Sequence, residues 1–144
     1  MNAAFADMLA DSYLKLLGEP LVPDGRRGAE AAAWLDDAPF GLLAHDTSPD
    51  PLFVYANRKA QEAFGYRRDE FTGLPSRLSA GEEDRASRHA FIDSVRRKGY
   101  ATGYRGPRVA RDGHQFWIED VTLWNLFDAG GTLAGQAALI PRTS

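Results

Sequence analysis

The stretch from Pro51 to Gly73, PLFVYANRKAQEAFGYRRDEFTG, decides how the rest of the chain is placed. Its apolar, β-prone start predicts a strand over Leu52–Asn57. The next residues, Arg58–Phe64, fit a short helix that ends at Gly65, because glycine readily adopts the left-handed conformation of a helix C-terminus. Acidic residues then open a second short helical turn. The stretch therefore predicts a strand that leads directly into two short helices.

Two helices and one strand are expected before this stretch. Apolar residues recur at helical spacing between Asn2, which can cap a helix, and Gly18, which ends it. An alanine-rich helix follows over Ala29–Ala38. The segment Phe40–His45 reads as a strand, and the Pro- and Asp-rich turn after it predicts a hairpin with Leu52–Asn57.

The C-terminal half combines one long helix with three strands. Ser79–Glu82, SAGE, fits a capping box, in which the serine and glutamate side chains each accept a hydrogen bond from a free amide, and it predicts a helix over Ala80–Lys98. Apolar residues then alternate over Tyr100–Ala110, His114–Phe127 and Thr132–Ile140. Asp-Gly and Gly-Gly turns join these strands, so an antiparallel meander is expected.

Both faces of the middle strand are apolar, which predicts a sheet covered on both sides. Simple alternation places Phe116, Ile118, Trp124 and Leu126 on one face and Trp117, Val121 and Leu123 on the other, so at most one of the two tryptophans can line an interior space. The N-terminal helices or a dimer partner are the expected cover for the second face.

The predicted fold class is therefore α+β. We expect a five-stranded antiparallel sheet with short helices and one long helix on one face, and two further helices at the N-terminus. Residues 1–38 are expected to form a helical arm and residues 39–144 the sheet domain.

Composition restricts the function. The formal net charge of -3 argues against direct binding to nucleic acid, which needs a surplus of basic residues. The chain has no cysteine, which excludes disulfides, thiolate metal sites, cysteine nucleophiles and a flavin–cysteine adduct. No apolar run approaches the roughly 20 residues that span a bilayer, and the N-terminus lacks the basic and apolar regions of a signal peptide. A cytoplasmic protein without membrane contact is expected.

Several short motifs carry a resemblance to a known family. They are HDTSPDPLFVYAN at His45–Asn57, LPSRLSA at Leu74–Ala80, Tyr-x-Gly-x-Arg at Tyr104–Arg108, WN at Trp124–Asn125 and GQAA at Gly135–Ala138. Together they resemble the MEKHLA domain family, a PAS-like group. In addition, VYAN followed by FGY, a long helix and RDGHQFWIE resembles the PAS fold across about Pro39–Ile140. The resemblance implies a sensory or regulatory module rather than an enzyme, and it assigns no settled ligand.

A PAS-like sheet curves around an interior space, and polar residues at its edges are the candidates for ligand binding. The candidate ligand-binding residues are His45, Asn57, Ser76, Arg77, Trp124 and Gln136. Asn57 also suits a helix cap. Arg77 offers a forked donor for a carboxylate or phosphate, or else it pairs with Glu70 or Asp69. Gln136 lies among small residues that leave room beside it.

The sequence identifies no cofactor. Some PAS modules hold haem through a histidine on the long helix, but charged neighbours surround His89, so neither haem nor flavin is indicated. The histidines lack metal-ligand spacing, and no metal site is expected. The partner is an unidentified small molecule or signalling protein, and a homodimer through the N-terminal helices or the sheet face is left open.

We expect a stand-alone PAS-like sensory module that binds a small molecule or protein partner and signals through its sheet face and N-terminal helices. One alternative is a cone-shaped isomerase or dehydratase fold that uses His45 and Asp46 as an acid–base pair. Another is a ligand-free dimerisation or interaction domain whose interior is filled by Phe53, Tyr55, Phe64 and Trp124.

Overall fold

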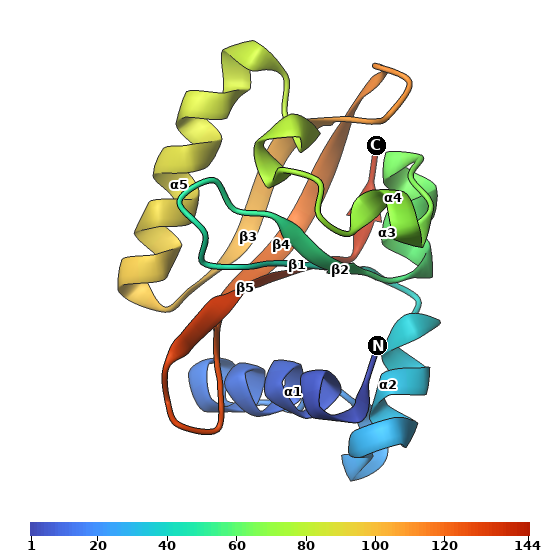
Figure 1. The fold of residues 1–144 in the computed structure, drawn as a ribbon, viewed down its shortest axis with the longest axis vertical. Helices are drawn as coiled ribbons and strands as arrows, with labels where there is room; N and C mark the ends of the chain where they lie inside the picture. Colours follow the sequence, from blue (N-terminus) through green and yellow to red (C-terminus); the bar gives the residue numbers. More distant parts are fainter.

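One antiparallel sheet runs through the middle of the molecule, with helices on both of its faces (Figure 1). The computed structural model describes residues 1–144. The strands are β1 (Gly41–His45), β2 (Phe53–Ala56), β3 (Tyr100–Val109), β4 (Gln115–Phe127), β5 (Leu133–Ile140) and β6 (Arg142–Thr143). They lie in the order β2-β1-β5-β4-β3, and the short β6 also pairs with β4. The five predicted strands and both hairpin turns of the C-terminal meander are confirmed.

The helices form two layers. They are α1 (Ala3–Leu17), α2 (Gly28–Asp36), α3 (Arg58–Phe64), α4 (Arg68–Phe71) and α5 (Arg85–Lys98), with single 3-10 turns η1 (Pro23–Gly25), η2 (Ser76–Ser79) and η3 (Glu82–Asp84). In Figure 1, α1 and α2 lie on one side of the sheet, here called the outer face, and α3, α4 and α5 lie on the other, the inner face. The predicted α+β fold class is confirmed. None of the helices is both long and apolar enough to cross a membrane.

Local sequence signals set the ends of α1 and α3. The Asn2 side chain accepts a hydrogen bond from the amide of Phe5 at 2.7 Å, and Gly18 ends α1 in the left-handed region with φ of 76°. Asn57 caps α3 in the same way, and Gly65 ends that helix, also with φ of 76°. Both helices therefore begin and end where the sequence predicts.

The long helix starts later than predicted. Gly81 has an extended conformation, with φ of -62° and ψ of 155°, so no helix runs through it. The Ser79 hydroxyl donates to the carbonyl of Ser76 at 2.7 Å inside η2 rather than accepting from a helix amide. The predicted capping box is therefore wrong, because Ser79 is used by its own 3-10 turn, and α5 begins only at Arg85.

The outer face is covered by the N-terminal helices. Trp124 is fully buried there, and its indole N–H donates to the carbonyl of Leu9 in α1 at 3.3 Å. Its ring meets Tyr13 edge-on, with centroids 4.9 Å apart. The amide of Phe127 donates to the Ser12 hydroxyl at 3.0 Å. Apolar packing and matched polar groups thus hold α1 against β4.

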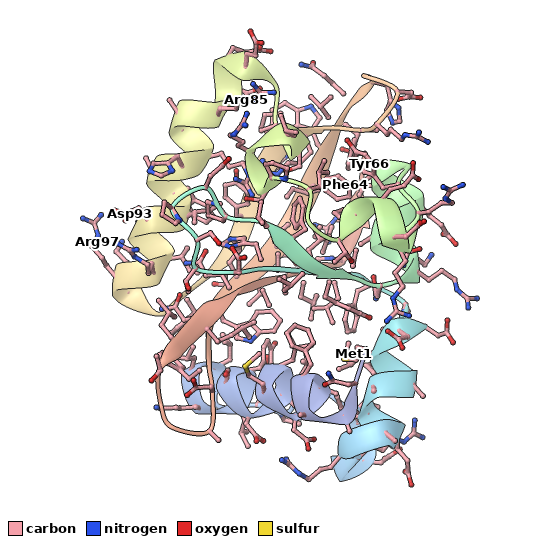
Figure 2. The ribbon with its side chains drawn as sticks, viewed as in Figure 1. Met1, Phe64, Tyr66, Arg85, Asp93 and Arg97 are labelled. Carbon is pink, nitrogen blue, oxygen red and sulfur yellow. The ribbon has the colours of Figure 1, made fainter.

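The inner face carries a second core under α3, α4 and α5. Phe64 lies in this layer in Figure 2 and packs edge-to-face against Phe71 and Phe116, with centroid distances of 5.7 and 5.0 Å. Asp93 and Arg97 point away from the sheet on the far side of α5 (Figure 2). The amphipathic pattern of α5 therefore separates a buried stripe from a charged outer surface.

Two bulges correct the predicted assignment of β4 side chains to faces. Asp120 in β4 and Gly103 in β3 both have positive φ, 56° and 67°, and the register between the two strands shifts on either side of Tyr104. An extra residue between Ile118 and Val121 keeps both on the inner face. Trp124 consequently lies on the outer face, and the prediction that it shares a face with Phe116 and Ile118 is wrong.

Candidate ligand cavity

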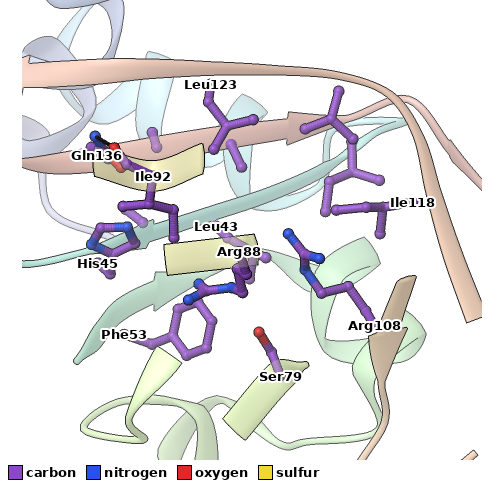
Figure 3. A pocket seen from close by; sticks show the side chains of 15 residues that line it. Leu43, His45, Phe53, Ser79, Arg88, Ile92, Arg108, Ile118, Leu123 and Gln136 are labelled. Atoms are coloured by element: carbon purple, nitrogen blue, oxygen red, sulfur yellow. Dashed lines mark hydrogen bonds between the residues drawn. The ribbon is translucent and has the colours of Figure 1, made fainter. Parts of the chain in front are cut away.

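A small cavity lies between the inner face of the sheet, η2 and α5 (Figure 3). Its volume is about 40 Å³, enough for a water molecule or a small polar group. Aliphatic side chains of β1, β4 and β5 form most of the wall. The polar side chains in the wall are His45, Ser79, Arg88, Arg108 and Gln136. Polar groups from five separate elements therefore converge on one apolar space.

Arg88 enters this cavity from α5 without an acidic partner. Helical spacing places it on the same side of α5 as Ile92 and Val95, which face the sheet. The residue is 9% exposed, and its Nε has no hydrogen-bond partner. Burial, with the nearby charge of Arg108, lowers the pKa of Arg88 to about 9. A buried cation without a counter-ion raises the free energy of the folded protein.

The Tyr-x-Gly-x-Arg motif holds Arg108 in the cavity wall. The Nη1 of Arg108 donates to the Pro107 carbonyl at 2.7 Å and to the Tyr104 hydroxyl at 3.4 Å. A side chain at Gly106 would overlap with the Tyr104 hydroxyl, so only glycine lets the tyrosine fold across the strand. Phe91 of α5 stacks on the other side of Tyr104, with centroids 4.1 Å apart. The motif therefore positions a buried guanidinium group rather than forming a turn.

His45 presents an acceptor atom to the cavity. Its Nδ1 lies 3.0 Å from the Asp46 carbonyl, and because a carbonyl can only accept, Nδ1 carries the proton. The Nε2 atom is then an acceptor, and it has no partner, although the Gln136 side chain lies close by. Burial lowers the pKa of His45, which keeps the ring neutral at neutral pH. Gly135 permits the close approach of β5, since a side chain there would overlap with the His45 carbonyl.

Gln136 also presents an acceptor, and a hydrogen-bond network determines this orientation. Its Nε2 donates to the Ile92 carbonyl and to the Asn125 side-chain oxygen, both at 3.1 Å. Asn125 in turn donates from Nδ2 to the Arg96 carbonyl at 2.9 Å. Since both backbone carbonyls only accept, each amide group has one allowed orientation. The Gln136 Oε1 is therefore left as a buried acceptor without a partner.

Two of the six predicted ligand-binding residues, His45 and Gln136, meet at this cavity, and Asn57 and Trp124 do not. The Asn57 side chain makes four hydrogen bonds within the protein, to β1, to α3, to the end of α2 and to the residue before β1. It has no polar atom left for a ligand and acts as a cap and spacer. Trp124 lies beneath α1, so the prediction that it lines the interior is wrong; the β4 bulge is the reason.

The two predicted residues of the Pro75–Ser79 loop also lie outside the cavity wall. Ser76 is fully buried, and its hydroxyl has no partner, but it does not line the cavity. Arg77 is exposed and pairs with Asp50 at 3.2 Å rather than with the acidic residues of α4. The ion pair joins η2 to the β1–β2 turn and leaves Arg77 directed into solvent.

Sequence reasoning missed three cavity residues: Ser79, Arg88 and Arg108. A signal existed for Arg88, because it lies four and seven residues before Ile92 and Val95 and so falls on the inward stripe of the helix. Arg108 stands at the end of the Tyr-x-Gly-x-Arg motif, in phase with Tyr104. Ser79 was assigned to a helix cap, which hid its position in the cavity wall.

The acid–base pair of the isomerase alternative is not formed. The Asp46 carboxylate accepts hydrogen bonds from the amides of Ser48 and Leu52, at 3.1 and 2.9 Å. Partial burial acts in the opposite direction, but these hydrogen bonds hold the pKa of Asp46 below its ordinary value. Asp46 therefore orders the turn after β1, and only its backbone carbonyl contacts the His45 ring.

A second cavity of about 80 Å³ adjoins the first, and His45, Ile92 and Gln136 belong to both walls. Asp46 and Asp93 also lie in the wall of this adjoining cavity. Larger hollows, such as the groove of about 420 Å³ between α3 and the C-terminal residues, are open at the surface and gather no buried polar atom that lacks a partner. The interior cavity is therefore the better candidate for a site.

Solved structures with the same arrangement are PAS-type domains. A PAS domain from Colwellia psychrerythraea is 19% identical with a TM-score of 0.68, and the match covers 76% of this chain and 91% of that one. A light-oxygen-voltage domain studied with a flavin analogue is 23% identical with a TM-score of 0.62, and the match covers 77% of this chain and 82% of that one. At these identities the likeness establishes the PAS-like fold.

The interior does not fit a flavin or a haem. Ligand pockets for molecules of that size measure roughly 300 to 1,000 Å³, whereas the cavity measures about 40 Å³. The guanidinium groups of Arg88 and Arg108 occupy the space beside it (Figure 3). His89, the histidine considered for haem, is exposed and lines only the adjoining cavity.

Sequence comparison agrees with the fold and is more specific. A bacterioopsin transcriptional activator of Halobacterium salinarum is 30% identical over 114 residues, which is 78% of this chain but only 16% of that protein. The family model of the MEKHLA domain matches residues 3–144, so the match includes α1 and α2 as well as the sheet. With a PAS-like fold and a family match over nearly its whole length, the chain belongs to the MEKHLA domain family.

Proposed function

We propose that this protein is a PAS-like sensory or regulatory module that binds a small molecule in the interior cavity and passes the binding event to its N-terminal helices. The observation that carries the proposal is the convergence of His45 Nε2, Arg88 Nε and Gln136 Oε1 on one cavity, each buried and without a partner. An unsatisfied buried polar group costs about 1 to 3 kcal/mol. A ligand that supplies the missing partners would recover this free energy.

A chain of hydrogen bonds supports transmission from the cavity to α1. Gln136 and Asn125 join β5 and β4 to the backbone of α5 on the inner face. Trp124 and Phe127, the β4 neighbours on either side of Asn125 and Leu126, bond to α1 on the outer face. A shift of α5 caused by ligand binding would therefore move strands that α1 contacts directly. Such a shift changes the population of docked α1 only if the ligand binds the two arrangements differently.

Native mass spectrometry and hydrogen exchange test this proposal. Protein purified from its own host is expected to carry a small-molecule adduct, and the amides of α1 between Leu9 and Tyr13 are expected to exchange at a different rate after the adduct is removed by refolding. An adduct with unchanged α1 exchange would contradict transmission. Absence of any adduct, with a stable dimer, would favour the second candidate.

The second candidate is a ligand-free dimerisation or interaction domain, and the small size of the cavity favours it. Phe53 and Phe64 fill the inner core as that alternative requires, while Tyr55 and Trp124 belong to the outer core instead. Since α1 and α2 cover the outer face, a partner would meet the end of the sheet near Trp117, which is 39% exposed. Replacing Trp117 by Ala would then break the dimer without changing the fold.

A further inference from the structure

Two buried guanidinium groups face the cavity, and no acidic side chain lines it. Arg88 and Arg108 are 9% and 6% exposed, and Arg108 has only a carbonyl and a hydroxyl as partners. In Figure 3 both side chains extend into the space between Phe53, Ser79 and the sheet, Arg88 from α5 and Arg108 from β3. A water molecule can accept a hydrogen bond there but cannot neutralise the charge. The site therefore lacks an anion.

The other end of the cavity has the opposite requirement. His45 Nε2 and Gln136 Oε1 are both acceptors, and both lack a donor. Their roles follow from backbone contacts, because the Asp46 and Ile92 carbonyls use the protonated atoms of the two side chains. A ligand that satisfies the whole cavity must thus carry an anionic acceptor group at one end and a hydrogen-bond donor at the other.

We propose that the cavity binds a short carboxylic acid that bears a hydroxyl or amino group. The carboxylate lies between the guanidinium groups of Arg88 and Arg108, and the hydroxyl or amino group donates to His45 and Gln136. The inference rests on the proposed function and names the class of its ligand. A planar carboxylate matches the fork of a guanidinium group, and aliphatic side chains such as Leu43 and Leu123 suit the short carbon skeleton.

Size restricts the ligand to two to four carbons, as a rough bound from a cavity of about 40 Å³ with a second of about 80 Å³ beside it. Ile92 belongs to both walls, so a change of its rotamer would join the two spaces. Asp46 and Asp93 lie in the wall of the second cavity, where they suit an ammonium group. Phosphate fits less well, because its four oxygens need more donors than the aliphatic wall supplies.

Thermal unfolding with small acids tests the proposal. The full-length chain is unfolded at pH 7 and constant ionic strength with 10 mM lactate, glycine, propionate, phosphate or chloride. Lactate or glycine is expected to raise the unfolding temperature by about 3 °C, as for a ligand at roughly tenfold its dissociation constant. Propionate has the carboxylate without the donor, and we expect it to produce less than half of that shift.

Three variants separate binding from folding. Arg88→Met and Arg108→Met should abolish the shift, whereas Arg105→Gln should keep it, because Arg105 lies on the opposite side of β3 with Glu119 and Trp117. Arg88→Met should also unfold at a higher temperature than the parent when no acid is added, since it removes an unpaired buried charge. A lost response in that variant is then not a failure to fold.

Several results would overturn the proposal. These are no shift with lactate or glycine, an equal shift with phosphate or chloride, and a shift that persists in Arg88→Met. Equal shifts with lactate and propionate would remove His45 and Gln136 from the site. If these acids fail but a different adduct accompanies the native protein and alters exchange in α1, the ligand class is wrong and the proposed function still holds.

Discussion

The two faces of the sheet are built differently. On the outer face, the buried polar groups have partners: the Trp124 indole donates to Leu9, the Ser12 hydroxyl accepts from Phe127, and the Tyr55 hydroxyl donates to Asp36. On the inner side, the buried atoms without partners are those of His45, Ser76, Arg88 and Gln136. Complete satisfaction is typical of a packed core, and shared deficits around a cavity are typical of a binding site. The difference indicates that one face stabilises and the other recognises.

The largest expected effect is on the outer face. Trp124→Ala removes a fully buried ring and its hydrogen bond to α1, so we expect the free energy of unfolding to fall by about 3 to 5 kcal/mol. Urea unfolding followed by circular dichroism measures this loss. Trp117→Ala is the matched control, because Trp117 is exposed and stacks only under Arg105, and it should cost less than about 1 kcal/mol. Equal losses would contradict the assignment of the two tryptophans.

Asn57 joins the two layers, and its replacement should have the next largest effect. Asn57→Ala leaves the amides of Leu42 and Ala60 and the carbonyls of Leu35 and Phe40 without their partner, so we expect a loss of about 2 to 4 kcal/mol. The measurement is again urea unfolding, with the lactate or glycine response recorded as well. A variant that keeps its stability but loses the ligand response would return Asn57 to the binding site.

His45 gives the inner face a dependence on pH. Burial lowers the pKa of His45, and Asp46 and Arg88 are the charged groups nearest to it. As pH falls below about 6.5, the unfolded chain takes up a proton before the folded protein does, so stability is unaffected above that pH and is lost below it. The loss should be on the order of 1 kcal/mol between pH 7 and 5, relative to a His45→Asn variant. Parallel stability curves for the two proteins would show that His45 titrates normally.

The smallest expected effect is at Arg77. Its ion pair with Asp50 is exposed on both sides, so Arg77→Ala should change the free energy of unfolding by less than about 0.5 kcal/mol. The response to lactate or glycine should be that of the parent protein, measured by the same thermal unfolding assay. A lost response would place Arg77 in the site, against its position on the surface.

Much of the fold was predictable from local signals. The cap at Asn2, the stops at Gly18 and Gly65, and the Asp-Gly and Gly-Gly turns each act over a few residues, so their effects survive in any tertiary context. The candidate site was only half predictable. His45 and Gln136 stood out as polar residues at strand positions, whereas Arg88 and Arg108 read as surface arginines, because burial of a charged group is rare and depends on the surroundings.

The sequence by itself determined the α+β class, the order of the elements and the covering of both sheet faces, since these follow from hydrophobic periodicity and turn chemistry. Only the tertiary structure decided which face each side chain of β4 meets, because one residue in the left-handed region, Asp120, reverses the alternation beyond it. It also decided that two arginines share a cavity without an acid. That pairing joins α5 to β3 across the fold, and no local pattern specifies it.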